Sequence, residues 1–362
     1  MNKKNLTHIE HACMMCDTMM RKFAAPDLPP KHKFHYHQGV FLSGMLSTYK
    51  VCGEEKYYEY IKAWVDSIIY PDGSIHDFDK KMLDDIQPGI LLLYLYKRTG
   101  DERYAAALKT LMPILREWKR NEAGGFWHKE FLPDQMWLDG LYMAGPLQAE
   151  YAAVFDEHGF LETAIEQAYL MKQYMTDKNT GLLFHAWDQS KKEWWADSET
   201  GLSSEIWGRA LGWYAVAVLD ILKFTPQDHP QRQGLVDIEY ELLKSVVNYQ
   251  DDKTGMWFQV VDKINRSDNW VETSCTSLFV YAIARAVEAG ILDKSYLSYA
   301  QRGYEGIIDN SLEYQNDDAL LSGICIGTNV CNYTGYISRP TSTNDLHGVG
   351  AFLLMSSQMA AI

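Results

Sequence analysis

The sequence predicts an all-α protein built as an (α/α)6 barrel, which is a closed toroid of six helical hairpins. Three observations lead to this fold class. A unit of helix, glycine-marked turn and second helix recurs along the 362 residues, the two helices of a unit differ in their apolar pattern, and six units are present. Repeats of this size are typical of helical arrays. We expect six units to close into a ring, and we expect residues 1–362 to form one domain.

The first two units define the pattern. An apolar helix begins near Tyr36, the chain breaks at Gly53, and apolar residues then recur at helical spacing between residues 58 and 68. The second unit repeats this plan from residue 87, with its break at Gly100. Glycine suits the left-handed position just past a helix end. Further units open at residues 137–140, 207–209, 273–275 and 347–350.

The two helices of each unit have different surroundings. The first is apolar nearly all round, as in residues 214–219, whereas the second has a single apolar face. This difference predicts an inner ring of buried helices and an outer ring that faces water. Segments rich in Trp, His, Gly and Asp precede the inner helices, for example residues 124–129, 181–188 and 255–259. We expect them to gather at one mouth of the toroid, where loops carry function.

Composition excludes several classes of partner. The formal net charge of −14 opposes binding to nucleic acid or to anionic membranes, because no strong basic patch offsets it. The apolar runs are too short to span a bilayer. The first residues lack the apolar stretch of a secretory signal, so a cytoplasmic location is the default expectation. The sequence carries no prediction of an oligomeric state.

One cysteine segment resembles a metal site at first sight. Cys13 and Cys16 lie just after His8 and His11. On a helix, however, His8 and Cys16 share a face while the other two point elsewhere. No second Cys/His pair completes a tetrahedral zinc site, so we expect buried, inert thiols in a reducing compartment.

Polar residues near the starts of the inner helices are the candidates for chemistry: Tyr36, Asp84, Asp85, Asp139 and Arg209. The simplest explanation of any one acid is a helix cap. Their shared position at one end of the toroid favours a functional site. Asp139 lies among large apolar and aromatic residues, which raise a carboxyl pKa and keep the acid protonated, as a general acid requires.

Arg209 is the candidate binding group for an anion. It lies two residues after Trp207 and one helical turn before Trp213. A guanidinium pairs with a carboxylate through two hydrogen bonds and stacks on aromatic rings. A purely structural ion pair is the alternative. The sequence has no phosphate-binding glycine loop, no Gly-x-Ser-x-Gly elbow and no His-Glu-x-x-His pair.

Several of these segments together resemble a known family. Residues 125–129, 135–143 (QMWLDGLYM) and 207–214 (WGRALGWY) are similar to the unsaturated rhamnogalacturonyl hydrolases, family 105 of the glycoside hydrolases. The resemblance continues in order through residues 181–187, 194–197, 272–274 and 344–353, and so covers nearly the whole chain. The family fold is an (α/α)6 barrel, as the repeat predicts.

The resemblance implies roles for particular residues. Asp139 would be the general acid and Asp84 the second acid of the site, with Asp85 left open as a neighbouring alternative. The substrate-binding residues that it implies are Tyr36, His128, Trp137, His185, Trp207, Arg209 and Trp213. The implied substrate is an unsaturated acidic oligosaccharide made by a polysaccharide lyase. Hydration of its C4=C5 double bond would need neither a metal nor an organic cofactor.

Other functions fit the same residues less closely. An unsaturated glucuronyl hydrolase would use the same acid on other lyase products, and His185 favours the galacturonyl type by resemblance. An inverting glycosidase or a sugar epimerase could share the toroid. A non-catalytic toroid that binds acidic oligosaccharides would need the aromatic loops and Arg209. It would not need Asp139 and Asp84.

Overall fold

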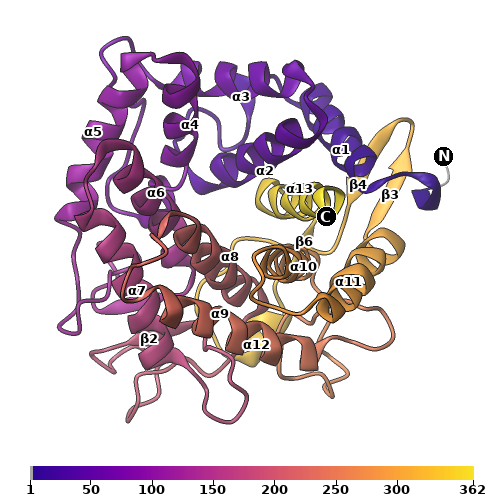
Figure 1. The fold of residues 1–362 in the computed structure, drawn as a ribbon. Coiled ribbons are helices and arrows are strands. Elements are labelled where there is room, and N and C mark those ends of the chain that lie inside the picture. The colour runs from indigo at the N-terminus through magenta and orange to yellow at the C-terminus, as the bar shows by residue number, and fades with distance from the viewer. Residues whose placement is uncertain (1–2) are drawn as a thin grey trace.

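The two predicted kinds of helix occupy two concentric rings in the computed structural model, which describes residues 3–362 (Figure 1). The inner ring consists of α2 (Tyr36–Cys52), α4 (Gly89–Thr99), α6 (Asp139–Phe155), α8 (Gly208–Phe224), α10 (Thr273–Glu288) and α13 (Leu346–Ala361). The outer ring consists of α1 (His8–Lys22), α3 (Glu55–Ile68), α5 (Glu102–Arg116), α7 (Gly159–Met175), α9 (Arg232–Val246) and α11 (Leu297–Asn310). The prediction of an all-α (α/α)6 barrel is confirmed.

The glycine-marked turns end the inner helices as predicted. Gly53 and Gly100 adopt left-handed conformations, with φ of 74° and 68°, just past α2 and α4. Residues with a Cβ rarely adopt this conformation, so glycine stops each helix at a defined residue. Asp101 then accepts a hydrogen bond of 3.0 Å from the backbone N–H of Arg103 and caps α5.

The ring closes where its first and last inner helices meet. Helix α13 packs against α2 on one side and α10 on the other. The α2–α13 approach requires glycine, because a Cβ on Gly44 would lie 2.5 Å from the carbonyl oxygen of Gly350. A Cβ on Gly350 would lie 2.4 Å from the carbonyl oxygen of Val40. The outer helix α1 packs on α13, so the two ends of the chain form the sixth hairpin (Figure 1).

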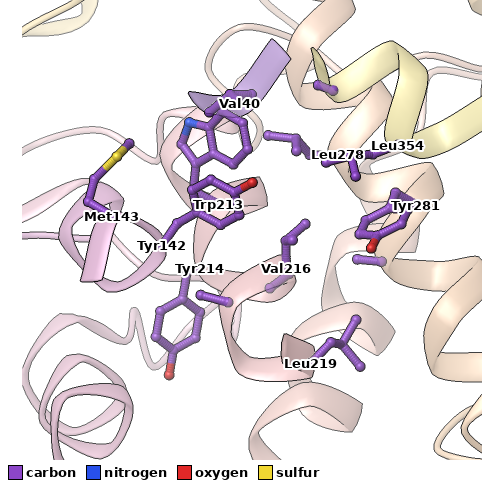
Figure 2. Packing of buried hydrophobic residues seen from close by; sticks show 14 of the residues in the cluster. Val40, Tyr142, Met143, Trp213, Tyr214, Val216, Leu219, Leu278, Tyr281 and Leu354 are labelled. Carbon is purple, nitrogen blue, oxygen red and sulfur yellow. The ribbon is translucent and has the colours of Figure 1, made fainter. Parts of the chain in front are cut away.

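The side chains of the inner helices form the core. Trp213 stacks on Tyr142 with ring centroids 4.3 Å apart, which joins α8 to α6 (Figure 2). Tyr214 points away from Trp213 in Figure 2, and its hydroxyl donates to the carbonyl of Ala168 in α7 at 2.8 Å. Two consecutive residues of α8 therefore contact a neighbouring inner helix and an outer helix. Burying a large apolar side chain stabilises the fold by about 1.5–3 kcal/mol, which explains why these helices are apolar nearly all round.

Short strands and turns lie between the helical pairs. The antiparallel pairs are β1 (Gln135–Trp137) with β2 (Ala186–Asp188), β3 (Leu312–Gln315) with β4 (Asp318–Leu321), and β5 (Ile324–Cys325) with β6 (Thr341–Ser342). A short helix, α12 (Tyr333–Ile337), follows β5. Three-residue 3-10 helices lie at Lys3–Asn5, Ala25–Asp27, Leu83–Asp85, Val247–Tyr249 and Lys294–Tyr296. The β1–β2 pairing brings the segment before α6 beside the segment that carries His185.

Two expectations from composition can be compared with these helices. Within residues 3–362, no helix is long and apolar enough to cross a membrane.

All six cysteines are free, and Cys16 is fully buried. Burial raises the pKa of Cys13 to about 12 and holds that of Cys16 well above its usual value, so both are thiols rather than thiolates. In the part of the chain that the structure describes, they belong to no group of three potential metal ligands.

Candidate active site

The starts of the inner helices surround a cavity of about 210 Å³. Its walls comprise His35, Tyr36, His37, Asp84, His128, Lys129, Trp137, Asp139, Met143, Trp207, Arg209, Trp213, Gly327, Thr328 and Asn329. Ligand cavities that enclose a drug-sized molecule measure about 300–1,000 Å³. The cavity is therefore suited to a single small group, with the rest of a longer ligand outside.

Asp139 is the first residue of α6, yet it does not cap the helix. The N-cap is Leu138, and no side chain caps this end. Instead, Asp139 Oδ2 lies 3.1 Å from His185 Nε2. The other ring nitrogen, Nδ1, lies 2.6 Å from the hydroxyl of Tyr336, which itself accepts from the backbone N–H of Cys331. This network assigns the proton to His185 Nε2, which donates to the Asp139 carboxylate.

The expected protonation of Asp139 is wrong for the protein without substrate. Burial does favour the neutral acid, as the sequence suggested, but other effects outweigh it. The hydrogen bond from His185 and the electrostatic influence of His185, His128 and the Arg209 cation lower the pKa of Asp139 below its usual value. The apolar neighbours were visible in the sequence, whereas the distant donor and cations were not. In the free protein, Asp139 is therefore ionised at neutral pH.

The second acid candidates separate clearly in space. Both lie in the 3-10 helix Leu83–Asp85, and neither caps α4. Asp84 lines the cavity, with its carboxylate oxygens 3.4 Å from His128 Nε2 and 3.5 Å from Lys129 Nζ. Asp85 is buried and does not line the cavity. Burial and the negative charge of Asp84 raise the pKa of Asp85 to about 8, so Asp85 is a neutral acid at neutral pH.

Arg209 is almost completely buried, with 2% of its surface exposed. Its guanidinium donates to the carbonyls of Cys325 at 2.5 Å and Ile326 at 2.9 Å, and it lies 4.5 Å from the centre of the Trp207 ring. Among residues 3–362, no carboxylate forms an ion pair with it, so the structural ion pair considered above is not found. The buried Glu272 reaches it only indirectly, through Ser274. A buried cation on the cavity wall can therefore pair with an incoming anion.

Aromatic rings hold these polar groups in position. His128 stacks on Trp137 at 4.5 Å, and Trp137 meets His185 edge-on at 5.5 Å. Trp207 contacts His185 at 4.7 Å. The apolar face of a sugar stacks on aromatic rings, and a sugar carboxylate pairs with a cation. Aromatic walls beside an acid and a cation therefore suit a sugar that carries a carboxylate.

Most of the residues proposed from the sequence meet at this cavity. The exceptions are Asp85 and His185, and His185 is fully buried in contact with Asp139 without lining the wall. Sequence reasoning missed His35, His37, Lys129, Met143, Gly327, Thr328 and Asn329. Lys129 follows His128 directly and could have been found from that motif. The segment 327–329 carries no charge or helical period that would have indicated it.

A larger cavity of about 780 Å³ lies at the opposite end of the inner ring. It is lined by residues in the later turns of the inner helices, including Lys50, Glu150, Asp220 and Arg285. It contains none of the proposed site residues. The smaller cavity is the stronger candidate, because its buried Arg209 has no carboxylate partner among the described residues, whereas Arg285 in the larger cavity pairs with Asp220.

Comparison with known proteins finds similarity to glycoside hydrolases. The family model of Glycosyl Hydrolase Family 88 matches residues 11–362. Unsaturated rhamnogalacturonyl hydrolase YesR of Bacillus subtilis is 28% identical over 309 residues, covering 83% of this chain and 82% of that protein. A family 105 glycoside hydrolase from C. acetobutylicum superposes with a TM-score of 0.92 at 32% identity, over 97% of this chain and 99% of the other. An unsaturated glucuronyl hydrolase from Bacillus sp. GL1 has a TM-score of 0.72 at 14% identity, over 96% of this chain and 94% of the other, and shares the fold.

Proposed function

Because the chain belongs to glycosyl hydrolase family 88, we propose that it removes the terminal unsaturated galacturonyl residue from lyase-generated rhamnogalacturonan fragments. The chain is a glycoside hydrolase, and its class acts on unsaturated glycuronyl oligosaccharides. The galacturonyl preference is supported by the similarity to the Bacillus subtilis hydrolase. The observation that carries the proposal is that Asp139 and Arg209 line the same cavity. The guanidinium of Arg209 is buried and has no carboxylate partner among the described residues.

The proposed reaction begins with placement of the sugar. The carboxylate of the unsaturated residue pairs with Arg209, and the ring lies against Trp207 or Trp137. The bound carboxylate offsets the positive field of Arg209 on Asp139, and the sugar displaces water from the cavity. Both changes raise the pKa of Asp139 in the complex relative to the free protein. Substrate binding thus favours the protonated acid that the free protein lacks.

Proton transfer then hydrates the double bond. Asp139 donates its proton to C4, and positive charge develops on C5 and the ring oxygen. Water adds to C5 and returns a proton to Asp139, which now acts as a base. The resulting hemiketal opens by cleavage of the bond between C5 and the ring oxygen. The hemiacetal left at C1 collapses to an aldehyde and releases the remaining oligosaccharide as an alcohol.

The surrounding residues have supporting roles in this proposal. His185 holds the Asp139 carboxylate in one orientation through the 3.1 Å hydrogen bond. Asp84, held by His128 and Lys129, orients the attacking water and balances the developing positive charge. Asp85 does not line the cavity, so we assign it no direct role in the reaction.

The test follows the ultraviolet absorbance of the conjugated double bond. Purified protein is mixed with the unsaturated rhamnogalacturonan disaccharide, and we expect a steady fall that disappears in Asp139→Asn. Asp252→Asn, at a fully exposed site, is the matched control and should retain wild-type turnover. A fall only with unsaturated glucuronyl substrates would reassign the sugar and keep the mechanism. No fall with either substrate would refute the proposed activity.

A further inference from the structure

Three potential metal ligands meet where the inner ring closes. His37 lies in the first turn of α2, Asp345 is the N-cap of α13, and His347 is in the first turn of α13. One ligand atom from each lies within 4.8 Å of the others. The sequence separates His37 from the other two by almost the whole chain, so only ring closure brings them together.

The hydrogen bonds of His347 leave one ring nitrogen unprotonated beside Asp345. Its Nε2 lies 3.0 Å from the carbonyl oxygen of Cys325. A carbonyl can only accept, so Nε2 carries the proton and Nδ1 is unprotonated in the neutral ring. Nδ1 lies 2.8 Å from Asp345 Oδ1, but this contact does not have the geometry of a hydrogen bond. Two acceptors thus lie side by side, on the buried His347 and the partly exposed Asp345, with no proton shared between them.

The hydrogen bonds of His37 lead to the same result. Nδ1 of His35 accepts from the backbone N–H of His37 at 3.4 Å, so this atom has a lone pair. The Nδ1 of His37, 3.0 Å away, must then donate to it. This leaves Nε2 of His37 unprotonated, 3.9 Å from Asp345 Oδ1. Both histidines therefore have an unprotonated nitrogen near the same carboxylate.

From this arrangement we propose that His37, Asp345 and His347 bind a divalent transition-metal ion, with Zn²⁺ as its best-fitting probe. Metal ligands are held at about 2.0–2.2 Å, which places neighbouring ligand atoms about 2.8–3.4 Å apart and off each other's lone-pair axes. The 2.8 Å, non-linear contact between His347 and Asp345 matches that spacing. The distance of 3.9 Å between His37 Nε2 and Asp345 Oδ1 exceeds that spacing by about 0.5 Å. The imidazole and carboxylate ligands favour zinc and its neighbours over magnesium or calcium.

Outer contacts already orient these ligands. His35 fixes the ring of His37, and the Cys325 carbonyl fixes the ring of His347. Metal-bound histidines usually donate their second N–H in this way. The ion would join the first turn of α2 to the start of α13 and so hold the ring closed.

The surrounding charges also accommodate a cation. Tyr36, the neighbour of His37, lies in the fields of three carboxylates, Asp84, Asp139 and Asp345, and of one cation from α8, Arg209. With Lys129, which pairs with Asp84, these carboxylates still outnumber the cations by one, so their combined field favours a bound cation. The chemistry of the proposed hydrolase does not need the ion, so the two proposals can fail independently.

The experiment measures metal binding to the full chain without using activity. Protein treated with a chelator is titrated with Zn²⁺ by calorimetry and with Co²⁺ by visible absorption. We expect one equivalent to bind, Co²⁺ bands of a nitrogen- and oxygen-ligated ion, and a rise in the thermal midpoint of about 3–5 °C at a hundredfold excess over the dissociation constant.

Variants locate the ion. His37→Gln and Asp345→Asn should each weaken binding by at least about tenfold and remove the thermal shift. His158→Gln, which breaks an exposed His–Asp pair at 3.0 Å, is the matched control and should bind like wild type. Circular dichroism checks that each variant is folded. Absence of stoichiometric binding to the wild type overturns the proposal. Binding that His37→Gln and Asp345→Asn retain, or that His158→Gln loses, overturns it equally.

Discussion

The role of Arg209 gives the sharpest prediction about the reaction. Replacing it with Met removes a buried guanidinium that forms no ion pair with a carboxylate in the described residues. If the substrate carboxylate pairs with it through two charge-assisted hydrogen bonds of about 1.5–3 kcal/mol each, the loss is about 3–6 kcal/mol. We therefore expect kcat/KM in Arg209→Met to fall by about 10²- to 10⁴-fold. Arg209→Lys should recover only part of this, because Lys lacks the paired donors.

A second substrate separates carboxylate binding from a structural role. The methyl ester of the unsaturated disaccharide lacks the anionic charge, so wild-type protein should turn it over far more slowly than the acid. In Arg209→Met this preference should largely disappear. Arg285→Met is the matched control, since Arg285 pairs with Asp220 in the opposite cavity. It should lower stability while keeping the preference for the acid. A residual kcat/KM above one tenth of wild type in Arg209→Met, or an unchanged preference for the acid, would refute the assignment.

Four further predictions follow from the site and the ring. Asp139→Asn should lower kcat by at least about 10²-fold while substrate still quenches tryptophan fluorescence, and lost binding would instead indicate misfolding. The pKa of Asp139 is low in the free protein, and its protonated form is the active one. As pH rises, kcat/KM, which reports the free protein, should therefore begin to fall at a lower pH than kcat, which reports the complex. If both profiles fall at the same pH, substrate binding does not promote protonation of Asp139. Asp85 has a folded-state pKa raised to about 8 by burial, so its stabilising effect is full below its unfolded pKa and is lost as pH rises towards 8. Urea unfolding should show a loss of at most about 5 kcal/mol between pH 4 and 8, and an equal loss in Asp85→Asn would exclude this origin. Gly350→Ala should destabilise the ring by about 1–3 kcal/mol through its clash with the Val40 carbonyl, whereas Gly159→Ala, with open space around it, should not; equal denaturation midpoints would contradict the close approach.

The sequence by itself determined the helical architecture. Apolar periodicity and glycine-marked turns are local signals, because each depends on residues within a few turns of one helix. The same reasoning placed Asp139 and Arg209 at the starts of inner helices. Their simplest structural explanations, a helix cap and an ion pair, are not found among the described residues.

Tertiary structure decided what depends on contacts between distant residues. The pairing of α1 with α13 follows from ring closure, which no local pattern specifies. The low pKa of Asp139 has the same origin, because its partner His185 is 46 residues away. The choice of Asp84 over Asp85 as the cavity acid rests on which way a 3-10 helix turns its side chains.

The group of His37, Asp345 and His347 illustrates the limit most clearly. Each residue lies in an ordinary helix start, and nothing in the spacing of His37 relates it to the other two. They become neighbours only because two glycines let the first and last inner helices approach closely. Local sequence patterns report the surroundings of one turn of chain, whereas proton positions and metal ligation depend on groups that only the closed ring brings within a few ångströms.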